Sequence, residues 1–418
     1  MKIALVCPYN MFERSGGVQT LVMALAEGLK SRHHEVKIIT PRPAGFKGKV
    51  PEDYILLGNT TKFNPAMMGT TGAWTFDIDE KEVEGVLEAE KFDVINFHEP
   101  WAPILARQIL QISQTAHVGT FHANFADSMV AKSIVNMFIP YGRGIGKKMH
   151  VFTAVSPAPA SVLINKTRSN NRRAAELVKN IKYIPNGVDN SLYKPLKKRT
   201  PLSGPGTKTI VYVGRLEKRK GVEWLVKAFK LLSDEMPHAY LLIGGEGGHR
   251  SRLEQMVNTY AIPNVNFLGY VTEEQKRHLM SNADVFCAPA MFGESFGIVI
   301  IEAMASGAAI IAGRNIGFTT VVSGRGRLGL VDSEATEDFA SRLSVFLNDE
   351  TINRLARQWS LNEIKKYDYS KIVDQYEEAY RAALSQWRAD RHINGNNVKS
   401  EKKLAKLARR ISLRRQSR

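Results

Sequence analysis

The chain has 418 residues, of which 44% are hydrophobic and 24% charged, with 32 Gly and 17 Pro. This composition excludes collagen-like, low-complexity and wholly disordered proteins, and the length suffices for two domains that each bury a core. Of the formal net charge of +17, +9 lies in Arg388–Arg418, which contains 11 basic and 2 acidic residues. The positive charge is therefore concentrated near the C-terminal end.

The cysteines and the apolar stretches indicate the cellular compartment. Cys7 and Cys287 are too few for a disulfide framework or a zinc cluster, and each lies in an apolar stretch typical of a buried thiol. The longest apolar stretch, Ile298–Ala312, contains Glu302 and falls short of the roughly 18 to 20 apolar residues of a membrane span. The first apolar run is also too short for a secretory signal. We predict a protein of the reducing cytosol.

Residues 1–190 alternate short apolar runs with amphipathic stretches such as Val18–Ser31. Strand and helix in alternation predict a doubly wound α/β domain with a parallel sheet. The predicted strands are KIALVCP, EVKIIT, FDVINFH, AHVGTFH, VFTAVS and IKYIPNG.

A second α/β domain is predicted for 208–360, after a linker at 191–207 that is rich in Pro, Gly and Lys. Its predicted strands are TIVYVGR, AYLLIGG, NVNFLGY, ADVFCAP and AAIIAG. Helices at 361–387 precede a basic amphipathic or disordered tail at 388–418. Because ligands of such sheets bind beyond the carboxyl ends of the strands, we expect a cleft between two facing domains.

A glycine pair, Gly16-Gly17, follows the first strand and opens the first helix. Glycines at a helix start let backbone N–H groups approach an anion, although an ordinary loop would also explain them. The spacing G-x-G-x-x-G is absent, and the second strand ends without the acidic residue that holds a ribose. These two absences argue against an NAD site.

Three consecutive cations, Lys218, Arg219 and Lys220, follow the strand TIVYV within GRLEKRKG. Guanidinium and ammonium groups bind phosphate oxygens, while a solvated basic turn is the simpler alternative. The position at the carboxyl end of a strand favours an anion site.

The segment GESFGIVIIEAM places Glu294 before a helix and Glu302 eight residues later, within an apolar run. A carboxylate in such a run is costly without a partner. The helix start also offers free N–H donors to a phosphate. Two carboxylates beside it would suit a hydroxyl-rich ligand, although a helix-terminal charge and a snorkelling side chain would also explain them.

These segments together resemble the retaining glycosyltransferases of family four, which have the GT-B fold of two Rossmann-like domains. The resemblance covers the chain to about residue 385 and includes CPYN, SGGVQ, NFHEP, GTFHAN, IPNGVD, GRLEKRKG, FLGYVTEEQK and the Glu-x7-Glu segment. Several of these are similar to the bacterial phosphatidylinositol mannosyltransferases, which use GDP-mannose. The implied activity is mannose transfer to a phosphatidylinositol-type lipid, with no tightly bound cofactor.

By matching positions, the resemblance implies a donor diphosphate held by the backbone of Gly17 and by the side chains of Arg215 and Lys220. Further backbone donors would come from the helix start at Phe296, Gly297 and Ile298.

The resemblance also implies that Glu302 binds the ribose and that Glu273 and Lys276 belong to a base-recognition loop. A carboxylate can accept hydrogen bonds from guanine that uracil cannot offer. No cluster of His, Asp and Glu has metal-ligand spacing, so we expect no metal.

On the sugar and acceptor side, the resemblance implies catalytic roles for Glu294, which would bind mannose hydroxyls, and His122, near the reacting sugar. Tyr9, Gln19 and Asn59 match positions that face the inositol headgroup. A strand-end histidine in the domain wall would also explain His122. His98, in NFHEP, we interpret as structural.

Two segments depart from the family pattern. The helix that is basic in the lipid mannosyltransferases is acidic here, at Asp77–Glu84, and Arg314–Thr320 lacks the acidic residue often found there. The basic amphipathic tail Lys399–Arg418 can compensate by contacting an anionic membrane surface. We therefore expect a protein bound peripherally to the inner face of the cell membrane.

Two alternatives to this function remain. One is a glycosyltransferase that uses UDP-glucose and acts on diacylglycerol or a soluble acceptor. The other is a nucleic-acid-binding protein on a degenerate GT-B scaffold. The presence of all four charged residues of the family motifs, Arg215, Lys220, Glu294 and Glu302, argues against degeneracy. We expect no nucleic acid partner.

Overall fold

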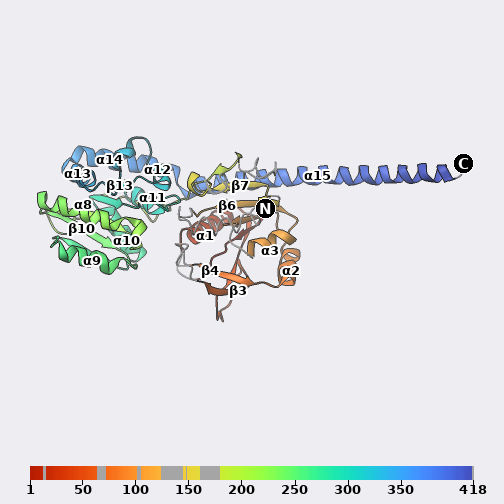
Figure 1. Ribbon diagram of the computed structural model, residues 1–418, viewed down its shortest axis with the longest axis horizontal. Coiled ribbons are helices and arrows are strands. Elements are labelled where there is room, and N and C mark those ends of the chain that lie inside the picture. The colour runs from red at the N-terminus through yellow and green to blue at the C-terminus, as the bar shows by residue number, and fades with distance from the viewer. Residues whose placement is uncertain are drawn as a thin grey trace.

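The computed structural model describes residues 1–12, 16–63, 72–100, 105–123, 145–146, 148–160 and 179–416, without the side chains of 60–77 and 393–416. Two sheets organise the chain, each covered by helices (Figure 1). The first sheet is built from residues 2–183 and the second from residues 208–331. The parallel α/β architecture predicted for both halves is confirmed.

The first sheet has the order β4-β3-β2-β1-β5-β6-β7-β8, and its pairs are parallel except for β3 with β4. Its strands are β1 (Lys2–Val6), β2 (Glu35–Arg42), β3 (Tyr54–Phe63), β4 (Gly72–Asp77), β5 (Val94–His98), β6 (Ala116–Phe121), β7 (Val151–Ala154) and β8 (Lys182–Tyr183). Its helices are α1 (Gly17–Lys30), α2 (Glu80–Glu90) and α3 (Leu105–Ile112).

The second sheet has the order β11-β10-β9-β12-β13-β14, with parallel pairs. Its strands are β9 (Lys208–Val213), β10 (Ala239–Gly244), β11 (Val265–Gly269), β12 (Val285–Ala288), β13 (Ala309–Gly313) and β14 (Leu330–Val331). Its helices are α8 (Val222–Glu235), α9 (Arg250–Thr259), α10 (Glu273–Asn282), α11 (Ile298–Ala305), α12 (Ile316–Val321), α13 (Thr336–Asn348) and α14 (Glu350–Glu363).

Burial accounts for several of the strands that the sequence predicted. Strands β1, β5, β6 and β12 are buried almost throughout, as expected for apolar runs covered on both faces. The sequence did not predict β3 and β4, which lie at the edge of the first sheet and contain Gly58-Asn59-Thr60 and other polar residues. Strand β14 has 2 residues and offers no pattern to detect. Both cysteines are buried, as predicted.

The last helix, α15 (Tyr369–Gln416), returns from the second sheet to the first, as Figure 1 shows. Ile372, Val373, Tyr376 and Tyr380 are fully buried in the core that α1 covers. The chain thus passes between the two sheets twice, and the two passages lie side by side: the N–H of Val188 donates to the carbonyl of Tyr367 at 2.9 Å. The predicted tail pattern falls on side chains outside the described residues.

Candidate active site

Two helix starts from opposite sheets meet at the candidate site. A Cβ atom at Gly17, the first residue of α1, would lie 2.6 Å from Cδ1 of Ile298, the first residue of α11. The hydroxyl of Ser156, after β7, donates to the carbonyl of Ser295. Each helix N-terminus carries partial positive charge and free N–H groups, so their convergence favours an anion. Because Gly17 has no side chain, the terminal methyl of Ile298 can lie against the start of α1.

Phe296 and Gly297 shape the start of α11 in different ways. The Phe296 side chain is buried, with its ring 5.7 Å from that of Tyr367, so only its backbone is available to a ligand. Gly297 adopts φ 109° and a Cβ there would lie 2.8 Å from the Phe318 ring. This left-handed backbone, which glycine alone adopts readily, directs the chain into the helix.

The basic segment after β9 forms one turn of 3₁₀ helix at Lys218–Lys220, which ends at Gly221. Gly221 has φ 70°, and a Cβ there would lie 2.0 Å from the Pro289 carbonyl oxygen. The absence of a side chain therefore lets the basic turn approach the end of β12, close to α11.

Glu294 is fixed by two of these cations. Its Oε1 lies 2.7 Å from Lys220 Nζ and 2.9 Å from Arg219 Nη1, and its side chain is 11% exposed. Arg215 is half exposed and forms an ion pair of 2.6 Å with Glu217, which also pairs with Arg219. The structure thus places Arg215, Lys220 and Glu294 around one turn. From the sequence, Arg219 was predicted only as one of three cations of an anion site, and its ion pair with Glu294 was not predicted.

Glu302 has charged and polar partners, as expected for a carboxylate in an apolar helix. Its Oε1 accepts from Lys276 Nζ at 3.0 Å and from the Tyr193 hydroxyl at 3.2 Å. Glu273 contacts both of these groups, at 2.9 Å from Lys276 and 2.7 Å from Tyr193. Burial raises the pKa of Glu302, which the ion pair with Lys276 opposes. The structure brings Glu273, Lys276 and Glu302 together, as one site would require.

Tyr193 was missed by sequence analysis. It lies in the predicted linker, and its ring is 6% exposed against the second domain. Only the fold brings this residue to Glu302, 109 positions away in sequence. A lone aromatic in a Pro- and Lys-rich stretch gives no signal of such a contact.

His122, at the end of β6, belongs to a buried hydrogen-bonded row. Its Nε2 lies 2.9 Å from Nδ1 of His98, and the Nε2 of His98 lies 3.3 Å from the amide nitrogen of Asn96. The amide orientation of Asn96 is set by Thr120, which donates to its oxygen at 2.8 Å, and by the Tyr380 hydroxyl of α15, 2.8 Å from its nitrogen. His98 therefore contacts the predicted catalytic residue directly.

This row defines the protonation of both rings. Burial lowers the pKa of His122 to about 3, and burial together with His122 lowers the pKa of His98. Both rings are therefore neutral near pH 7. Because the Asn96 amide donates to Nε2 of His98, the His98 proton lies on Nδ1 and is donated to Nε2 of His122. The His122 proton then lies on Nδ1.

Glu99, next to His98, is a buried carboxylate that the sequence analysis did not single out. Its Oε1 accepts from the backbone N–H of His122 at 2.6 Å and from that of Ala123. Its backbone has φ 54°, an uncommon conformation for a non-glycine residue. Burial raises the pKa of Glu99 to about 7 against these two hydrogen bonds. Glu99 thus fixes the backbone that carries His122.

The three predicted acceptor positions lie at the carboxyl end of the first sheet. Tyr9 follows β1 and its carbonyl accepts from Thr40 at 2.8 Å. Gln19 caps its own helix, because its side-chain oxygen accepts from the Gly16 N–H at 3.0 Å. Asn59 is exposed on β3, opposite Arg42 of β2. The inositol-binding roles of Tyr9, Gln19 and Asn59 stay predictions.

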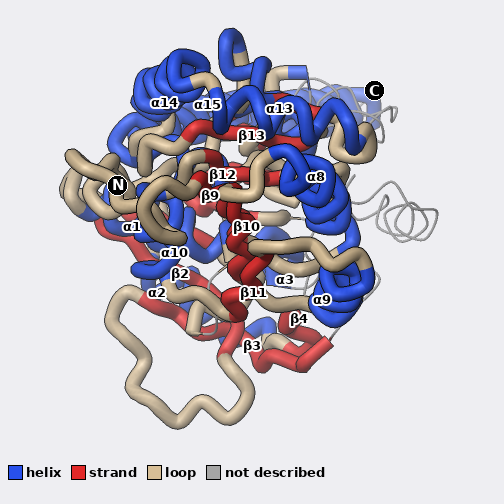
Figure 2. Tube along the Cα trace, turned by 90° about the vertical axis from the view of Figure 1, so that its left-hand side faces the viewer, coloured by secondary structure: helices blue, strands red, loops and turns tan. Residues whose placement is uncertain are grey.

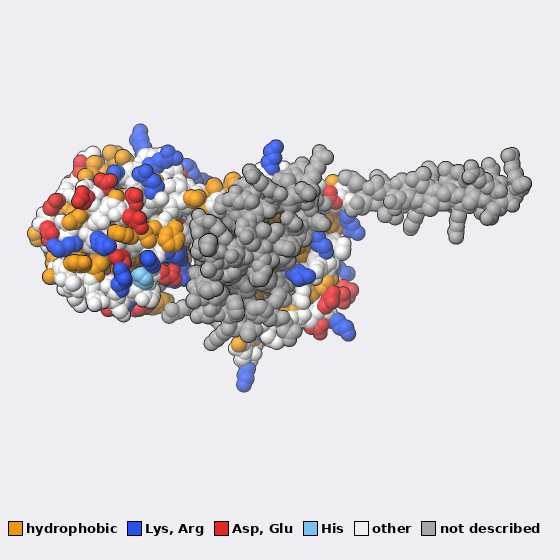
Figure 3. Space-filling model, in the orientation of Figure 1, with side chains coloured by type: hydrophobic (Ala, Val, Ile, Leu, Met, Phe, Trp, Pro, Cys, Tyr) orange, Lys and Arg blue, Asp and Glu red, His pale blue; other side chains and the backbone are white. Residues whose placement is uncertain are grey.

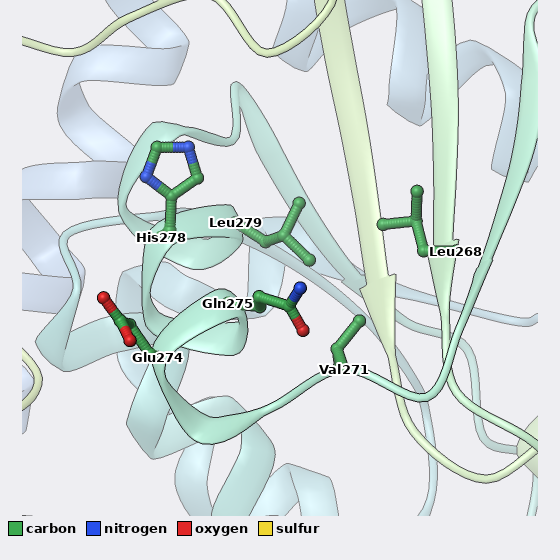
Figure 4. Close-up of a pocket in the computed structure, with 6 residues that line it drawn as sticks. All are labelled: Leu268, Val271, Glu274, Gln275, His278 and Leu279. Atoms are coloured by element: carbon green, nitrogen blue, oxygen red, sulfur yellow. The ribbon is translucent and has the colours of Figure 1, made fainter.

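A pocket of about 410 Å³ opens between α10 and the end of β11 (Figure 4). It adjoins the predicted base-recognition loop, since Val271 and Gln275 belong to the same segment as Glu273 and Lys276. Its lining residues are Leu268, Val271, Glu274, Gln275, His278 and Leu279.

Two features are absent from the part of the chain that the structure describes. No three His, Cys, Asp or Glu side chains among these residues are grouped so that they could hold a metal ion. None of the described helices is long and apolar enough to cross a membrane.

Solved structures share this architecture. Sucrose-phosphate synthase from Thermosynechococcus elongatus superposes with a TM-score of 0.71 at 21% identity, covering 92% of this chain and 99% of that one. HepE from Anabaena, solved with UDP-glucose, superposes with a TM-score of 0.68 at 19% identity, covering 91% and 100%. Two parallel-sheet domains with a C-terminal helix that returns to the first define the GT-B class of fold.

The sequence comparisons are more specific. The profile of Glycosyltransferase Family 4 matches residues 15–192, and that of Glycosyl transferases group 1 matches residues 194–366. The phosphatidyl-myo-inositol mannosyltransferase of Mycolicibacterium smegmatis is 32% identical over 384 residues, 91% of this chain and 93% of that protein. The enzyme of that name from Mycobacterium tuberculosis strain H37Rv is 31% identical over 388 residues, 91% and 96%. The chain belongs to the glycosyltransferase family that contains these mannosyltransferases.

Proposed function

We propose that this glycosyltransferase moves mannose from GDP-mannose to a phosphatidylinositol-type lipid, with retention at the anomeric carbon. The observation that carries the proposal is the convergence of the α1 and α11 starts beside Lys220 and Glu294. This arrangement suits a sugar diphosphate, because it offers cations and N–H donors to the phosphates and a carboxylate to the sugar hydroxyls. The names of the mycobacterial relatives support the choice of sugar and acceptor.

In the proposed mechanism the donor's anomeric carbon–phosphate oxygen bond breaks while the acceptor oxygen bonds to the same face of that carbon. The acceptor proton passes to the departing diphosphate, which remains bound. Arg215, Lys220 and the two helix starts stabilise the negative charge that develops on this leaving group. Glu294, fixed by Lys220 and Arg219, accepts from sugar hydroxyls, and the neutral His122 donates from Nδ1.

Glu302 would hold the ribose and Glu273 the guanine. Glu302 keeps free acceptor capacity beyond Lys276 and Tyr193, since a carboxylate has about four lone-pair sites. Glu273 is 69% exposed at its side chain and so remains available to a base.

The proposed site of action is the inner membrane surface. The acidic helix α2, capped by Asp79 and starting with Glu80, cannot attract anionic lipid. The basic tail Lys399–Arg418 supplies the attraction instead. No nucleic acid is required by this proposal, and truncation at residue 388 should weaken vesicle binding rather than the chemistry on a soluble acceptor.

The decisive experiment offers the purified protein GDP-mannose or UDP-glucose, with and without phosphatidylinositol vesicles. With vesicles present, we expect mannosylated lipid from GDP-mannose and no labelled lipid from UDP-glucose. If GDP-mannose binds but no lipid is labelled, the acceptor is wrong; if lipid is labelled from UDP-glucose, the donor is wrong.

Donor choice has a separate test in Glu273→Ala. Loss of its hydrogen bonds to guanine should weaken GDP binding about tenfold, while UDP binding changes less than twofold. Calorimetric titration measures both. Glu235→Ala, an exposed carboxylate at the end of α8 that does not line the α10 pocket, is the control and should leave both affinities unchanged. Equal losses for GDP and UDP in Glu273→Ala would contradict guanine recognition.

A further inference from the structure

The loop between β2 and β3, residues 43–53, projects from the first domain. Figure 2 shows this tan segment extending beyond the sheet and its helices, and Figure 3 shows basic and hydrophobic side chains at the same projection. The loop turns at Gly45, with φ 72°, where the Phe46 N–H donates to the Pro43 carbonyl at 3.1 Å.

Aromatic side chains connect this loop to the body of the domain. The Phe12 ring lies 5.2 Å from that of Phe46 and 5.2 Å from that of Tyr54, in tilted contacts. Phe12 is nevertheless 38% exposed, as is Val50 at the other end of the loop. An apolar surface is therefore held at the projection rather than buried beneath it.

Lysines flank this apolar surface. Lys47 and Lys49 are both exposed, and neither forms an ion pair with a residue that the structure describes. The acidic residues nearest in sequence are Glu52, which is exposed, and Asp53, which is paired with Lys30. Residues 43–51 thus combine apolar side chains with two cations and no carboxylate.

Along the chain, the same surface adjoins the predicted acceptor positions. Phe12 follows Tyr9 by three residues, and its N–H donates to the side chain of Asn10 at 2.9 Å. At the base of the loop, Arg42 lies opposite Asn59 in the sheet. A headgroup held at Tyr9 and Asn59 would therefore leave its acyl chains beside the projecting loop.

We propose that Phe12, Phe46, Lys47, Lys49 and Val50 form a docking surface for an anionic lipid bilayer. This inference rests on the proposed lipid acceptor and names the surface that brings the acceptor site to the membrane. Exposed apolar groups between cations match the boundary between acyl chains and anionic headgroups. The loop thereby adds to the attraction of the basic tail, on the domain whose acidic helix α2 cannot supply it.

The first test replaces Lys47 and Lys49 together by Gln in the full chain. From the usual contribution of a basic residue at an anionic surface, binding to phosphatidylinositol–phosphatidylglycerol vesicles should fall about 30-fold. Lys197→Gln with Lys198→Gln, two exposed linker lysines, changes the net charge equally and should alter binding less than twofold. Equal effects of the two pairs, or none, would overturn the proposal.

The second test reports the position of the loop itself, which keeps the basic tail from deciding the result. A polarity-sensitive dye is attached through Val50→Cys, because the two natural cysteines are buried. Its emission should shift to the blue with anionic vesicles but not with phosphatidylcholine alone. The same dye at Glu84→Cys, exposed on α2, should not shift. A shift on α2 without one at the loop would assign docking to the helix and refute the loop.

Further outcomes separate this inference from the proposed function. Blue-shifted dye with no mannosylated lipid leaves the docking surface intact and removes the acceptor assignment. If the Lys47→Gln, Lys49→Gln variant mannosylates vesicles normally and the dye at Val50→Cys does not shift, the acceptor assignment is kept and the docking surface is refuted. Loss of RNA or DNA binding by this variant with unchanged vesicle binding would overturn the membrane assignment.

Discussion

The carboxylates at the candidate site are stabilised in opposite ways in the two domains. In the second domain, Glu294 and Glu302 are each held by ammonium or guanidinium groups at 2.7 to 3.0 Å. In the first domain, Glu99 accepts from backbone N–H groups and lies beside neutral histidines. Ion pairs suit a site that must bind a charged diphosphate, whereas a neutral hydrogen-bonded row suits the positioning of a sugar or lipid hydroxyl.

The largest expected effect comes from breaking the charged side of this comparison. Lys220→Ala removes a cation from the leaving diphosphate and leaves Glu294 with Arg219, so turnover should fall about 100- to 1,000-fold. Steady-state assays measure the loss, and circular dichroism checks the fold. Lys218→Ala, an exposed lysine of the same turn, should retain near-normal turnover. Near-normal activity of Lys220→Ala would contradict its assignment.

An intermediate effect should come from Asn96→Asp, which reverses the direction of the hydrogen bonds along the row of Asn96, His98 and His122. A carboxylate only accepts hydrogen bonds, so the His98 proton should move to Nε2 and the His122 proton to Nε2 as well. Turnover should fall about 100-fold, the usual scale for a misplaced catalytic proton. Nitrogen-15 NMR of the rings detects the tautomers. Tyr380→Phe keeps the Asn96 amide and should keep both; reversed tautomers with full activity would argue against His122.

The smallest effect concerns the pH dependence of stability. His122 has a depressed pKa, so its contribution is present above about pH 6.5 and is lost as pH falls toward 3. Between pH 7 and 5, wild type should lose about 2 kcal/mol more unfolding free energy than His122→Gln. Urea denaturation at both pH values measures this difference.

Glu99 acts with the opposite sign in the same range. Its raised pKa stabilises the fold at low pH, and this contribution is lost as pH rises through about 7. Comparison with His122→Gln cancels the Glu99 contribution, since both chains retain it. His238→Gln, an exposed histidine, should follow wild type. If the difference in unfolding free energy between wild type and His122→Gln is the same at pH 7 and pH 5, His122 is not buried in neutral form.

Local patterns predicted more of the second domain than of the first. The basic turn and the Glu-x7-Glu segment are each continuous in sequence, so Arg215, Lys220, Glu294 and Glu302 could be identified without knowing the fold. Lys276 was named only through the family resemblance, and its ion pair with Glu302 supplies the partner that the apolar helix required.

The row beneath His122 could not be assembled from sequence because its members come from distant elements. Asn96 and His98 lie on β5, His122 follows β6, and Tyr380 lies on α15, 284 residues beyond Asn96. His98 was interpreted as structural, yet it contacts His122. Glu99 gave one possible signal, an acidic residue directly after an apolar strand.

The return of α15 to the first sheet makes the second domain an insertion in topological terms. Both ends of the second domain meet the rest of the chain at one place, where Val188 pairs with Tyr367 and Asp368. Gly187 permits this proximity, since a Cβ there would lie 2.5 Å from the Tyr369 ring. Exchange of this insert for that of a relative with another donor requires only two adjacent junctions, and the buried histidine row of the recipient would remain whole.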